Sequence, residues 1–363
     1  LGSVLAVDVV APEPLPPFPA SIMDGYAVVS SDGPGILEVV GRITAGVDPD
    51  SIRVSPGKCA YITTGAKLPQ GADAVVKVED TAAVDGADST ACNEEKSVRI
   101  LGGVRAGQSV RPVGYDIAEG ATVLRGGEAI NAAEIGLLAT VGVAEARVIP
   151  CPRVGVMSTG DELVEPGEKL SGGLIRDSNR STLLAAVASM GAVPVDLGIV
   201  RDKETTLKGA VLAALDRCDV LVTSGGVSMG EADLLKPILE SLGTVHFGRI
   251  CMKPGKPTTF ATTTGGGSGA GGGGDAPPGR LIFALPGNPV SSLVCSHLFV
   301  APAIRRMRGH SLQDCMLPQV DARLMSPLRM DTVRPEYHRA VVSWNNIAGC
   351  FDAVSTGSQM SSR

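Results

Sequence analysis

Polar turns rich in glycine or proline follow five expected strands in the middle of the chain. Each turn combines residues that bend the backbone with groups that bind anions or cations. The turns are residues 158–162 (S-T-G-D-E), 201–202 (R-D), 224–228 (S-G-G-V-S), 253–257 (K-P-G-K-P) and 285–289 (L-P-G-N-P). One such turn would mean little, because tight turns need glycine and proline anyway. Ligands bind outside the carboxyl ends of the strands of an open parallel sheet, so five such turns predict one shared site.

Two of these turns are typical of anion sites. The 224–228 segment is expected to open a helix, so its backbone N–H groups and the positive end of the helix dipole would form an anion cradle. The 286–289 segment leads through Val290 and Ser291 into a second expected helix with a second such end. Lys253 and Lys256 add two point charges in a proline-stiffened loop.

The substrate-binding residues expected from these turns share small, polar or cyclic side chains. They are Ser158, Thr159, Gly160, Asp161, Ser224, Gly225, Gly226, Ser228, Pro257, Pro286, Gly287, Asn288, Pro289 and Ser291.

Carboxylates accompany the anion-binding turns. Asp161, Glu162, Asp202 and Asp233 belong to the same expected edge of the sheet. Acids beside an anion pocket suggest a bridging Mg²⁺, which takes oxygen ligands and substrate phosphates. Taken singly, Asp233 fits equally well as an ordinary carboxylate on a helix face, and Asp202 as a loop cap.

Composition and missing motifs exclude several other classes. A net charge of −6 and an aromatic content of 3% argue against binding of nucleic acid or an anionic membrane surface. The S-G-G-V-S turn lacks the Gly-Lys-Ser/Thr of a P-loop, and no G-x-G-x-x-G follows the first strand. The eight cysteines are dispersed without a Cys-x-x-Cys, which favours reduced thiols and a cytoplasmic location. No apolar run reaches membrane-spanning length.

Strands alternate with helices in the middle of the chain, which predicts a parallel sheet with right-handed crossovers. The expected strands are 154–157, 193–200, 220–223, 245–252 and 281–285. The expected helices run from the caps at 177–179 to 190, then over 204–215, 232–242 and 289–307. Within this region, residues 264–279 form a Gly-rich segment that is expected to be a disordered surface loop, in preference to a lid.

The flanking regions have different patterns. Residues 22–117 contain short alternating runs with little helical periodicity, which predicts a β-rich module. Helical spacing returns over 130–141, with Asn131 as a cap. After Pro318 the runs 320–324, 339–344 and 351–355 alternate again and predict a small β domain.

These motifs together resemble the molybdenum insertase family, which includes bacterial MoeA, the gephyrin E domain and the plant insertase E domain. Besides the turns, the segments 21–28 (S-I-M-D-G-Y-A-V), 63–66 (T-T-G-A), 111–116 (R-P-V-G-Y-D), 334–339 (R-P-E-Y-H-R) and 355–362 (S-T-G-S-Q-M-S-S) carry the resemblance. It covers essentially the whole chain, in order. Any one motif is moderately specific, whereas the set is highly specific.

The resemblance implies a multidomain fold and a homodimer. A split linker subdomain would comprise 1–10 and 121–151, with an inserted β-rich module at 11–120. Residues 152–316 would form a three-layer α/β molybdopterin-binding domain with a mostly parallel sheet, and 317–363 a small C-terminal β domain. The family pattern also has a helix before Leu1 and strands after Arg363, so we expect the chain to be a piece of a longer protein.

The implied reaction inserts molybdate into adenylated molybdopterin, with Mg²⁺, and releases AMP. Asp202 and Asp233 resemble the family's metal ligands, and the expected catalytic residues are Asp202, Asp233, Glu162, Lys253 and Lys256. The residues that resemble the family's molybdate-site positions are Ser228, Lys253, Lys256, Pro257, Ser291, Arg339 and Ser361. Asp24, Thr64 and Asp116 match positions that face the partner subunit's cleft.

Two rival functions remain open at the level of sequence. A related molybdopterin adenylyltransferase would share the fold of 152–316, and such a domain is a possible fused or separate partner. That enzyme would not need the 21–28 or 334–339 segments. A gephyrin-like scaffold that anchors receptors would not need Lys253, Lys256, Asp202 and Asp233, all of which are present.

Overall fold

The computed structural model describes the chain except for residues 85–95, 227–233, 264–278, 330 and 361–363. Its residues divide into two compact units. The first comprises Leu1, Val7–Gly126 and Ile130–Arg147, and the second comprises Gly2–Ala6, Gly127–Ala129 and Val148–Arg363. No described helix is long and apolar enough to cross a membrane.

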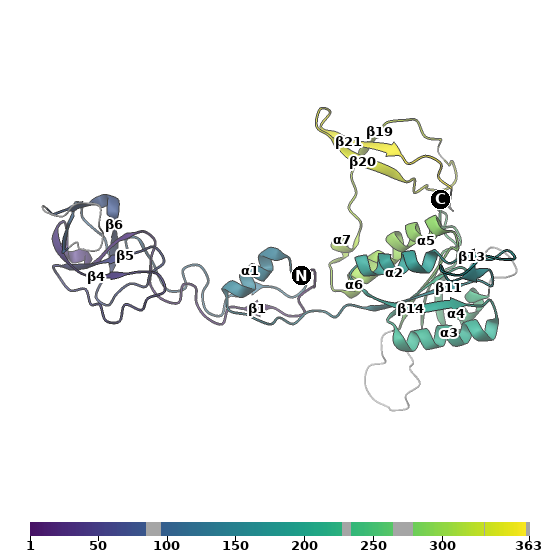
Figure 1. Cartoon of the computed structure of the whole chain (residues 1–363), viewed down its shortest axis with the longest axis horizontal. Coiled ribbons are helices and arrows are strands. Elements are labelled where there is room, and N and C mark those ends of the chain that lie inside the picture. The colour runs from purple at the N-terminus through teal and green to yellow at the C-terminus, as the bar shows by residue number, and fades with distance from the viewer. Residues whose placement is uncertain (85–95, 227–233, 264–278, 330, 361–363) are drawn as a thin grey trace, which may run out of the picture. The chain divides into compact units, whose positions relative to one another are not determined.

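The first unit is built mainly of strands (Figure 1). A six-stranded sheet has the order β6-β3-β5-β4-β8-β7, in which β4 and β5 are parallel and the other pairs antiparallel. Its strands are β3 (Gly25–Val28), β4 (Gly35–Ile43), β5 (Lys58–Ile62), β6 (Ala74–Lys77), β7 (Thr81–Ala83) and β8 (Ser97–Ile100). Alternate residues of β5 enter two separate apolar clusters, Cys59 in one and Ala60 and Ile62 in the other. The expected β-rich character of this stretch is therefore present.

Shorter elements complete the first unit. Two small antiparallel pairs join β1 (Val9–Val10) to β10 (Thr122–Leu124) and β2 (Ala20–Ser21) to β9 (Val110–Arg111). Two 3₁₀ turns occupy Ser30–Asp32 and Val78–Asp80. Helix α1 (Ala132–Thr140) begins at Asn131, whose side chain forms a capping box with Glu134. The predicted cap is confirmed, and its reciprocal hydrogen bonds satisfy N–H groups that the first turn leaves free.

A second six-stranded sheet dominates the second unit, with the order β14-β11-β15-β18-β17-β16. Strands β11 (Arg153–Thr159), β14 (Val193–Val200), β15 (Val220–Ser224) and β18 (Leu281–Leu285) are parallel. Strand β17 (Thr259–Thr263) runs antiparallel to both β18 and β16 (Gly243–Phe247). The sheet is thus mixed. The expected strand 245–252 was too long, because the chain leaves the sheet after Phe247 to form the lysine loop and returns as β17.

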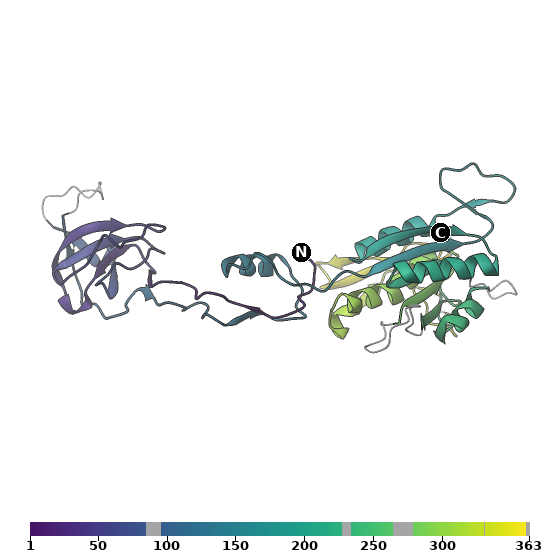
Figure 2. The same ribbon diagram turned by 90° about the horizontal axis from the view of Figure 1, so that it is seen from below.

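Helices cover both faces of this sheet (Figures 1 and 2). They are α2 (Asn179–Ser189), α3 (Glu204–Arg217), α4 (Leu235–Leu242), α5 (Pro289–Cys295), α6 (Ala301–Met307) and the short α7 (Leu312–Cys315). The expected helix 289–307 is interrupted by a π-helical turn, Ser296–Val300. Pro302 has no N–H to continue the α-helical ladder, which accounts for the local change in hydrogen bonding.

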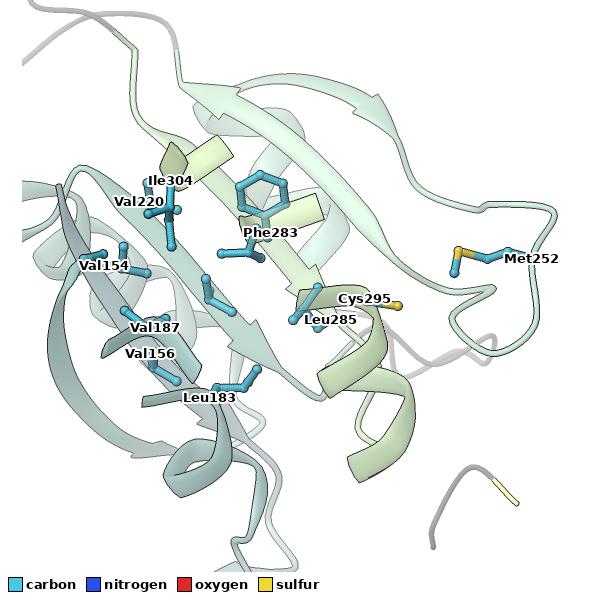
Figure 3. Close-up of a cluster of buried hydrophobic side chains, with 13 residues drawn as sticks. Val154, Val156, Leu183, Val187, Val220, Met252, Phe283, Leu285, Cys295 and Ile304 are labelled. Carbon is cyan, nitrogen blue, oxygen red and sulfur yellow. The ribbon is translucent and has the colours of Figure 1, made fainter. Parts of the chain in front are cut away.

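The core explains why the strands are continuous apolar runs. Val220 and Val222 face a cluster with Leu183 of α2 and Ile304 of α6 (Figure 3). Leu221, between them, faces α3 and α4 on the opposite side. Because both faces of the sheet are buried, successive residues of a strand must all be apolar. This is the predicted three-layer arrangement.

The C-terminal part of the second unit forms a three-stranded sheet of order β19-β21-β20. Its strands are β19 (Ala322–Leu324), β20 (Ala340–Asn345) and β21 (Cys350–Ser355). Trp344 and Phe351 are directly opposite each other on β20 and β21, and their rings meet edge to face at 5.0 Å. Two further short strands, β12 (Leu163–Val164) and β13 (Ile175–Arg176), pair beside the main sheet.

Candidate functional site

Three neighbouring parallel strands end level with one another in the second unit. Ser158 of β11 pairs in register with Ser224 of β15, which in turn pairs with Leu285 of β18. The N–H of Gly225 donates to the Leu285 carbonyl at 3.2 Å, so the turns that follow β15 and β18 touch. The predicted meeting of these turns at the carboxyl edge of the sheet is therefore observed.

The Ser224–Gly225–Gly226 turn needs its glycines. Gly225 and Gly226 have φ values of +92° and +68°, which residues with a side chain rarely adopt. A Cβ on Gly225 would lie 2.4 Å from the Thr159 carbonyl oxygen, and one on Gly226 would lie 2.8 Å from the Thr159 hydroxyl. The backbone of this turn is thus exposed to a ligand without shielding side chains. Whether the turn opens a helix lies outside the described residues.

The hydroxyls of β11 have different surroundings. Ser158 is fully buried and donates to the Asp177 carboxylate at 3.0 Å, so the structure gives it a local partner that the sequence did not predict. Thr159 is 3% exposed, and its hydroxyl has no hydrogen-bond partner within the described part of the chain. Buried polar atoms are normally paired. Thr159 therefore offers an unused hydrogen-bonding group beside the glycine turn.

Two residues of the expected helix cap prove to be structural centres of this edge. Asp177, 2% exposed, accepts from Ser158 and from the backbone N–H of Arg180. Asn179 donates to Ser224 and to the Gly287 carbonyl. The sequence identified 177–179 only as caps. The caps were predicted because a run of polar residues precedes an apolar helix. Nothing in the local sequence indicates that Asn179 bonds to residues 45 and 108 positions further along the chain.

Acidic side chains gather at the end of β14. The Asp202 N–H donates to the Asp161 carboxylate at 3.3 Å, and Arg201 donates to the Asp161 carbonyl at 2.5 Å. The pKa of Asp202 is raised above its ordinary value by partial burial, and further by the negative charges of Asp161 and Glu162. The charges of Asp161 and Glu162 thus act on Asp202, and a shared role of these acids in a metal site stays a prediction.

The donor chemistry of this cluster fits Mg²⁺. A cation would relieve the repulsion among Asp161, Glu162 and Asp202, and Mg²⁺ prefers oxygen ligands. Among the residues that the structure describes, no three acids, histidines or cysteines converge on a single metal position. A Mg²⁺ ion here would complete its coordination with water and substrate oxygens, as this ion commonly does. The second predicted ligand, Asp233, lies outside the described residues.

A cavity of about 300 Å³ lies between the lysine loop, the start of α5 and the segment 334–339. Its lining is mixed polar and apolar, and it combines groups of both charges. The lining residues are Met252, Lys253, Pro254, Gly255, Lys256, Pro257, Pro286, Asn288, Val290, Ser291, Arg334, Glu336, Tyr337, Arg339 and Gln359. The sequence predicted Lys253, Lys256, Pro257, Ser291 and Arg339 for one site, and all five line this cavity. It missed Glu336 and Gln359.

The two lysines differ in their partners. Lys253 donates to Glu336 at 3.2 Å, and its backbone is bridged to the same segment through Pro335 and Tyr337. Lys256 is exposed, and its ammonium makes no hydrogen bond or ion pair within the described chain, while its backbone carbonyl accepts from the Ile250 N–H at 2.9 Å. Both lysines were expected to supply point charges for an oxyanion, and the structure shows that Lys253 already pairs with Glu336; their roles toward a ligand stay predictions. Lys256 keeps its charge for a ligand.

Arg339 is held by the C-terminal strand region. Its guanidinium donates to the Gln359 side chain at 3.0 Å and to the Met360 carbonyl at 3.1 Å. Asn288 is the N-cap of α5, and Pro289 occupies its first turn, so the predicted helix end at P-G-N-P is confirmed. Ser228 and Ser361 lie outside the described residues.

The residues expected to face a partner subunit lie in the first unit. Asp24 accepts from the Thr64 N–H at 2.6 Å and from its hydroxyl at 2.8 Å, and these bonds lower the pKa of Asp24. Asp116 pairs with Arg111 at 3.0 Å. Each group thus has a local structural role, and a role across a dimer stays a prediction.

Comparisons with known proteins agree with this combination of fold and site. Residues 1–142 match the MoeA N-terminal region (domains I and II), and residues 155–306 match the probable molybdopterin-binding domain. A solved MoeA molybdopterin biosynthesis protein from Pyrococcus horikosii is similar at 34% identity with a TM-score of 0.69. That alignment covers 85% of this chain and 73% of the other. The fold and site thus place this chain in the MoeA class of multidomain α/β proteins.

Curated relatives extend the likeness over the chain. Molybdopterin molybdenumtransferase 2 of Mycobacterium tuberculosis is 37% identical over 356 residues, which cover 94% of this chain and 81% of that protein. Gephyrin of Dictyostelium discoideum is 42% identical over all of this chain. The chain belongs to the molybdopterin molybdenumtransferase family. It spans about half the length of that gephyrin, 54%.

Proposed function

We propose that this chain is a molybdenum insertase, which transfers molybdenum from molybdate into adenylated molybdopterin and releases AMP. The observation that carries the proposal is the cavity lined by Lys256, Ser291 and Arg339. It adjoins the glycine turns at the edge of the sheet through Pro286 and Asn288. A small oxyanion and a phosphate-bearing pterin can therefore lie next to each other.

Each part of the site has a distinct task in this reaction. Lys256 holds the molybdate dianion as an uncommitted ammonium, while the Ser224–Gly226 backbone and the start of α5 bind the phosphates. Asp202, with Asp161 and Glu162, lies where it can hold Mg²⁺, and Asp233 is proposed as the second ligand. Bound Mg²⁺ would neutralise charge at the adenylate that is cleaved.

The pocket also supports this function over an adenylyltransferase-like one. The segment 334–339 and Gln359 line the cavity although they belong to the sequence beyond the α/β domain at 152–316. An enzyme built on that domain alone would lack five of the fifteen residues that line the cavity. We further propose a cytoplasmic homodimer in which Asp24, Thr64 and Asp116 complete the partner's cleft. The subdomain boundaries given above belong to the same proposal.

Reconstitution of the cofactor tests the proposed function. Purified protein would be incubated with adenylated molybdopterin, molybdate and Mg²⁺, and then with a molybdoenzyme that lacks its cofactor. We expect activity of that enzyme to depend on this chain and on molybdate. Binding of both substrates without any transfer of active cofactor would show that the site is a binding module, and the proposal would have to be withdrawn.

A further inference from the structure

Asn179 lies where three loops meet at the carboxyl edge of the sheet. Its Nδ2 group donates to the Ser224 hydroxyl at 2.7 Å and to the Gly287 carbonyl at 2.6 Å. Ser224 ends β15, Gly287 lies between β18 and α5, and Asn179 itself opens α2. One side chain therefore joins the two turns that we assign to anion binding.

The orientation of this carboxamide is fixed by chemistry. A backbone carbonyl only accepts hydrogen bonds, so the atom that faces Gly287 must be Nδ2. Its two hydrogens are then both used, and Oδ1 is left buried without a partner in the described chain. An unsatisfied buried acceptor opposes folding. Asn179 is thus held in an orientation that leaves one of its own polar atoms, Oδ1, without a hydrogen bond.

The turns hold each other by few direct contacts: the Gly225 N–H donates to the Leu285 carbonyl at 3.2 Å, and the Ser224 hydroxyl donates to the Pro286 carbonyl at 3.5 Å. Gly225, Gly226 and Gly287 carry no side chains, and the position of a Cβ on Gly287 would be only 3.6 Å from the Gly225 Cα. Larger residues at Gly225 and Gly226 would collide with Thr159. Because the glycines contribute no side-chain contacts, a side chain from another element, Asn179, reinforces the direct bonds between the turns.

Asn179 is itself held rigidly by its neighbours. Asp177, two residues earlier, is bonded to Ser158 of β11. Arg180, the next residue, contacts Asp177 through its Nε at 3.1 Å and Asp196 of β14 at 2.7 Å. The first turn of α2 is therefore anchored to two strands, and it presents Asn179 from a fixed position.

We propose that Asn179 is a positioning residue, which sets the distance between the two glycine turns so that both contact the phosphate-bearing part of the adenylated pterin. This inference rests on the proposed function, which supplies the ligand. Ser224 and Gly287, which Asn179 contacts, do not line the molybdate cavity near Lys256, although Pro286 and Asn288 on either side of Gly287 do. Loss of the clamp should consequently weaken pterin binding and spare molybdate binding.

Two substitutions, one that removes the carboxamide and one that keeps its shape, separate loss of the contacts from loss of volume. Asn179→Ala removes both contacts, and we expect adenylated molybdopterin to bind at least tenfold more weakly while molybdate affinity stays within about twofold of the wild-type value. Asn179→Asp keeps the shape, but it sets a carboxylate oxygen against the Gly287 carbonyl and adds a negative charge near the cradle. It should bind the pterin more weakly than Asn179→Ala. Wild-type pterin affinity in either variant would overturn the proposal.

A double-mutant cycle distinguishes positioning from independent contacts. If Asn179 acts through Ser224, the double variant Asn179→Ala/Ser224→Ala should lose less affinity than the product of the two single losses. If the affinity loss of the double variant equalled the product of the two single losses, Asn179 and Ser224 would act independently, which would contradict a shared role. Thr182→Ala is the matched control, since Thr182 lies on the same helix and bonds only to the Ser178 carbonyl. That control should retain wild-type affinity for the pterin.

Hydrogen exchange tests the clamp without any turnover. Amides of residues 285–288 should exchange at least threefold faster in Asn179→Ala than in the wild-type protein, while those of α3 should not change. Equal exchange of 285–288 in the two proteins would overturn the positioning role even if the wild-type enzyme were active. Conversely, an inactive wild-type protein with faster exchange in the variant would count against the proposed function alone.

Discussion

Glu336 is the residue that makes Lys253 and Lys256 unequal. It accepts from Lys253 on one side and lies 3.7 Å from the His338 Nδ1 on the other. Both lysines of the loop were expected to supply point charges, and within the described chain Lys253 is paired with Glu336 whereas the Lys256 ammonium has no such partner. The consequence is that an oxyanion in the cavity should depend on Lys256 more than on Lys253.

Replacement of Lys256 should affect molybdate specifically. A hydrogen bond to a charged group contributes roughly 1.5–3 kcal/mol, so Lys256→Ala should weaken the use of molybdate by about ten- to a hundredfold. Lys256→Arg should also be impaired, because a planar fork does not replace a compact ammonium. Titrations with molybdate and with adenylated pterin measure the two affinities separately. Loss of pterin binding with normal molybdate affinity would contradict the assignment of the lysine loop.

Glu336→Gln should have the opposite effect on molybdate. Lys253 remains in place through its backbone bridge to Pro335 and Tyr337, and loss of the Glu336 charge leaves its ammonium unneutralised. We expect molybdate to bind about two- to fivefold more tightly at low salt, with the gain shrinking as ionic strength rises. Equilibrium dialysis against molybdate measures this directly. Weaker binding would mean that Glu336 is needed to orient Lys253.

At the scale of elements, the start of α2 is the most heavily bonded part of the site. Arg180 is 7% exposed and contacts Asp177, Asp196 and Glu165. Burial lowers the pKa of Arg180, but these carboxylates outweigh that effect and raise it. Arg180 thus connects β11, β14 and the loop that carries Glu165.

Arg180→Met should destabilise the second unit by about 3 kcal/mol, because it leaves the buried Asp177 carboxylate without its counter-ion. Glu165→Gln, which removes a half-exposed partner, should cost less than about 1 kcal/mol. Urea unfolding of the two variants measures the difference. Equal losses would show that the buried Asp177 pair is not the important contact.

The free energy of unfolding at low pH should also depend on the ion pairs of Arg180. Burial raises the pKa of Asp196, but its bonds to Arg180 and to the Gly198 N–H hold the pKa below its ordinary value of 3.8. A depressed native pKa means that the stabilisation is present above the unfolded pKa and is lost as pH falls through the native one. Unfolding free energy should therefore fall below about pH 4 in the wild type, and less steeply in Arg180→Met.

The sequence predicted elements better than contacts. Strand 193–200, strand 281–285 and the Asn131 cap agree with the structure, because local periodicity and capping chemistry determine them. It could not predict β17 or the end of β16, since antiparallel pairing depends on partners far along the chain. Asn179 and Glu336 were missed for the same reason: their roles arise only when distant loops meet.

At the scale of the whole molecule, the role that we propose for the first unit depends on Asp24, Thr64 and Asp116. Asp24 bonds to Thr64, and Asp116 pairs with Arg111. The identities that these residues share with the family therefore have a local structural explanation as well. A role in the cleft requires a second copy of the chain.

We predict a homodimer whose two sites each need the partner's first unit. Asp24→Ala and Lys256→Ala proteins would each be nearly inactive alone. Mixed in equal amounts under conditions that allow exchange of subunits, they should regain about a quarter of wild-type turnover, since half of the dimers are mixed and one of the two clefts in each mixed dimer carries both native residues. Sedimentation of a fully active monomer would contradict the shared cleft.

The stoichiometry of the reaction tests the central claim most directly. AMP released and molybdenum incorporated into pterin would be measured on the same sample of purified protein, adenylated molybdopterin and Mg²⁺, with and without molybdate. An insertase predicts one AMP for each molybdenum atom inserted and almost no AMP when molybdate is omitted. Release of AMP at the same rate without molybdate, or AMP release with no molybdenum incorporated, would contradict the proposed function.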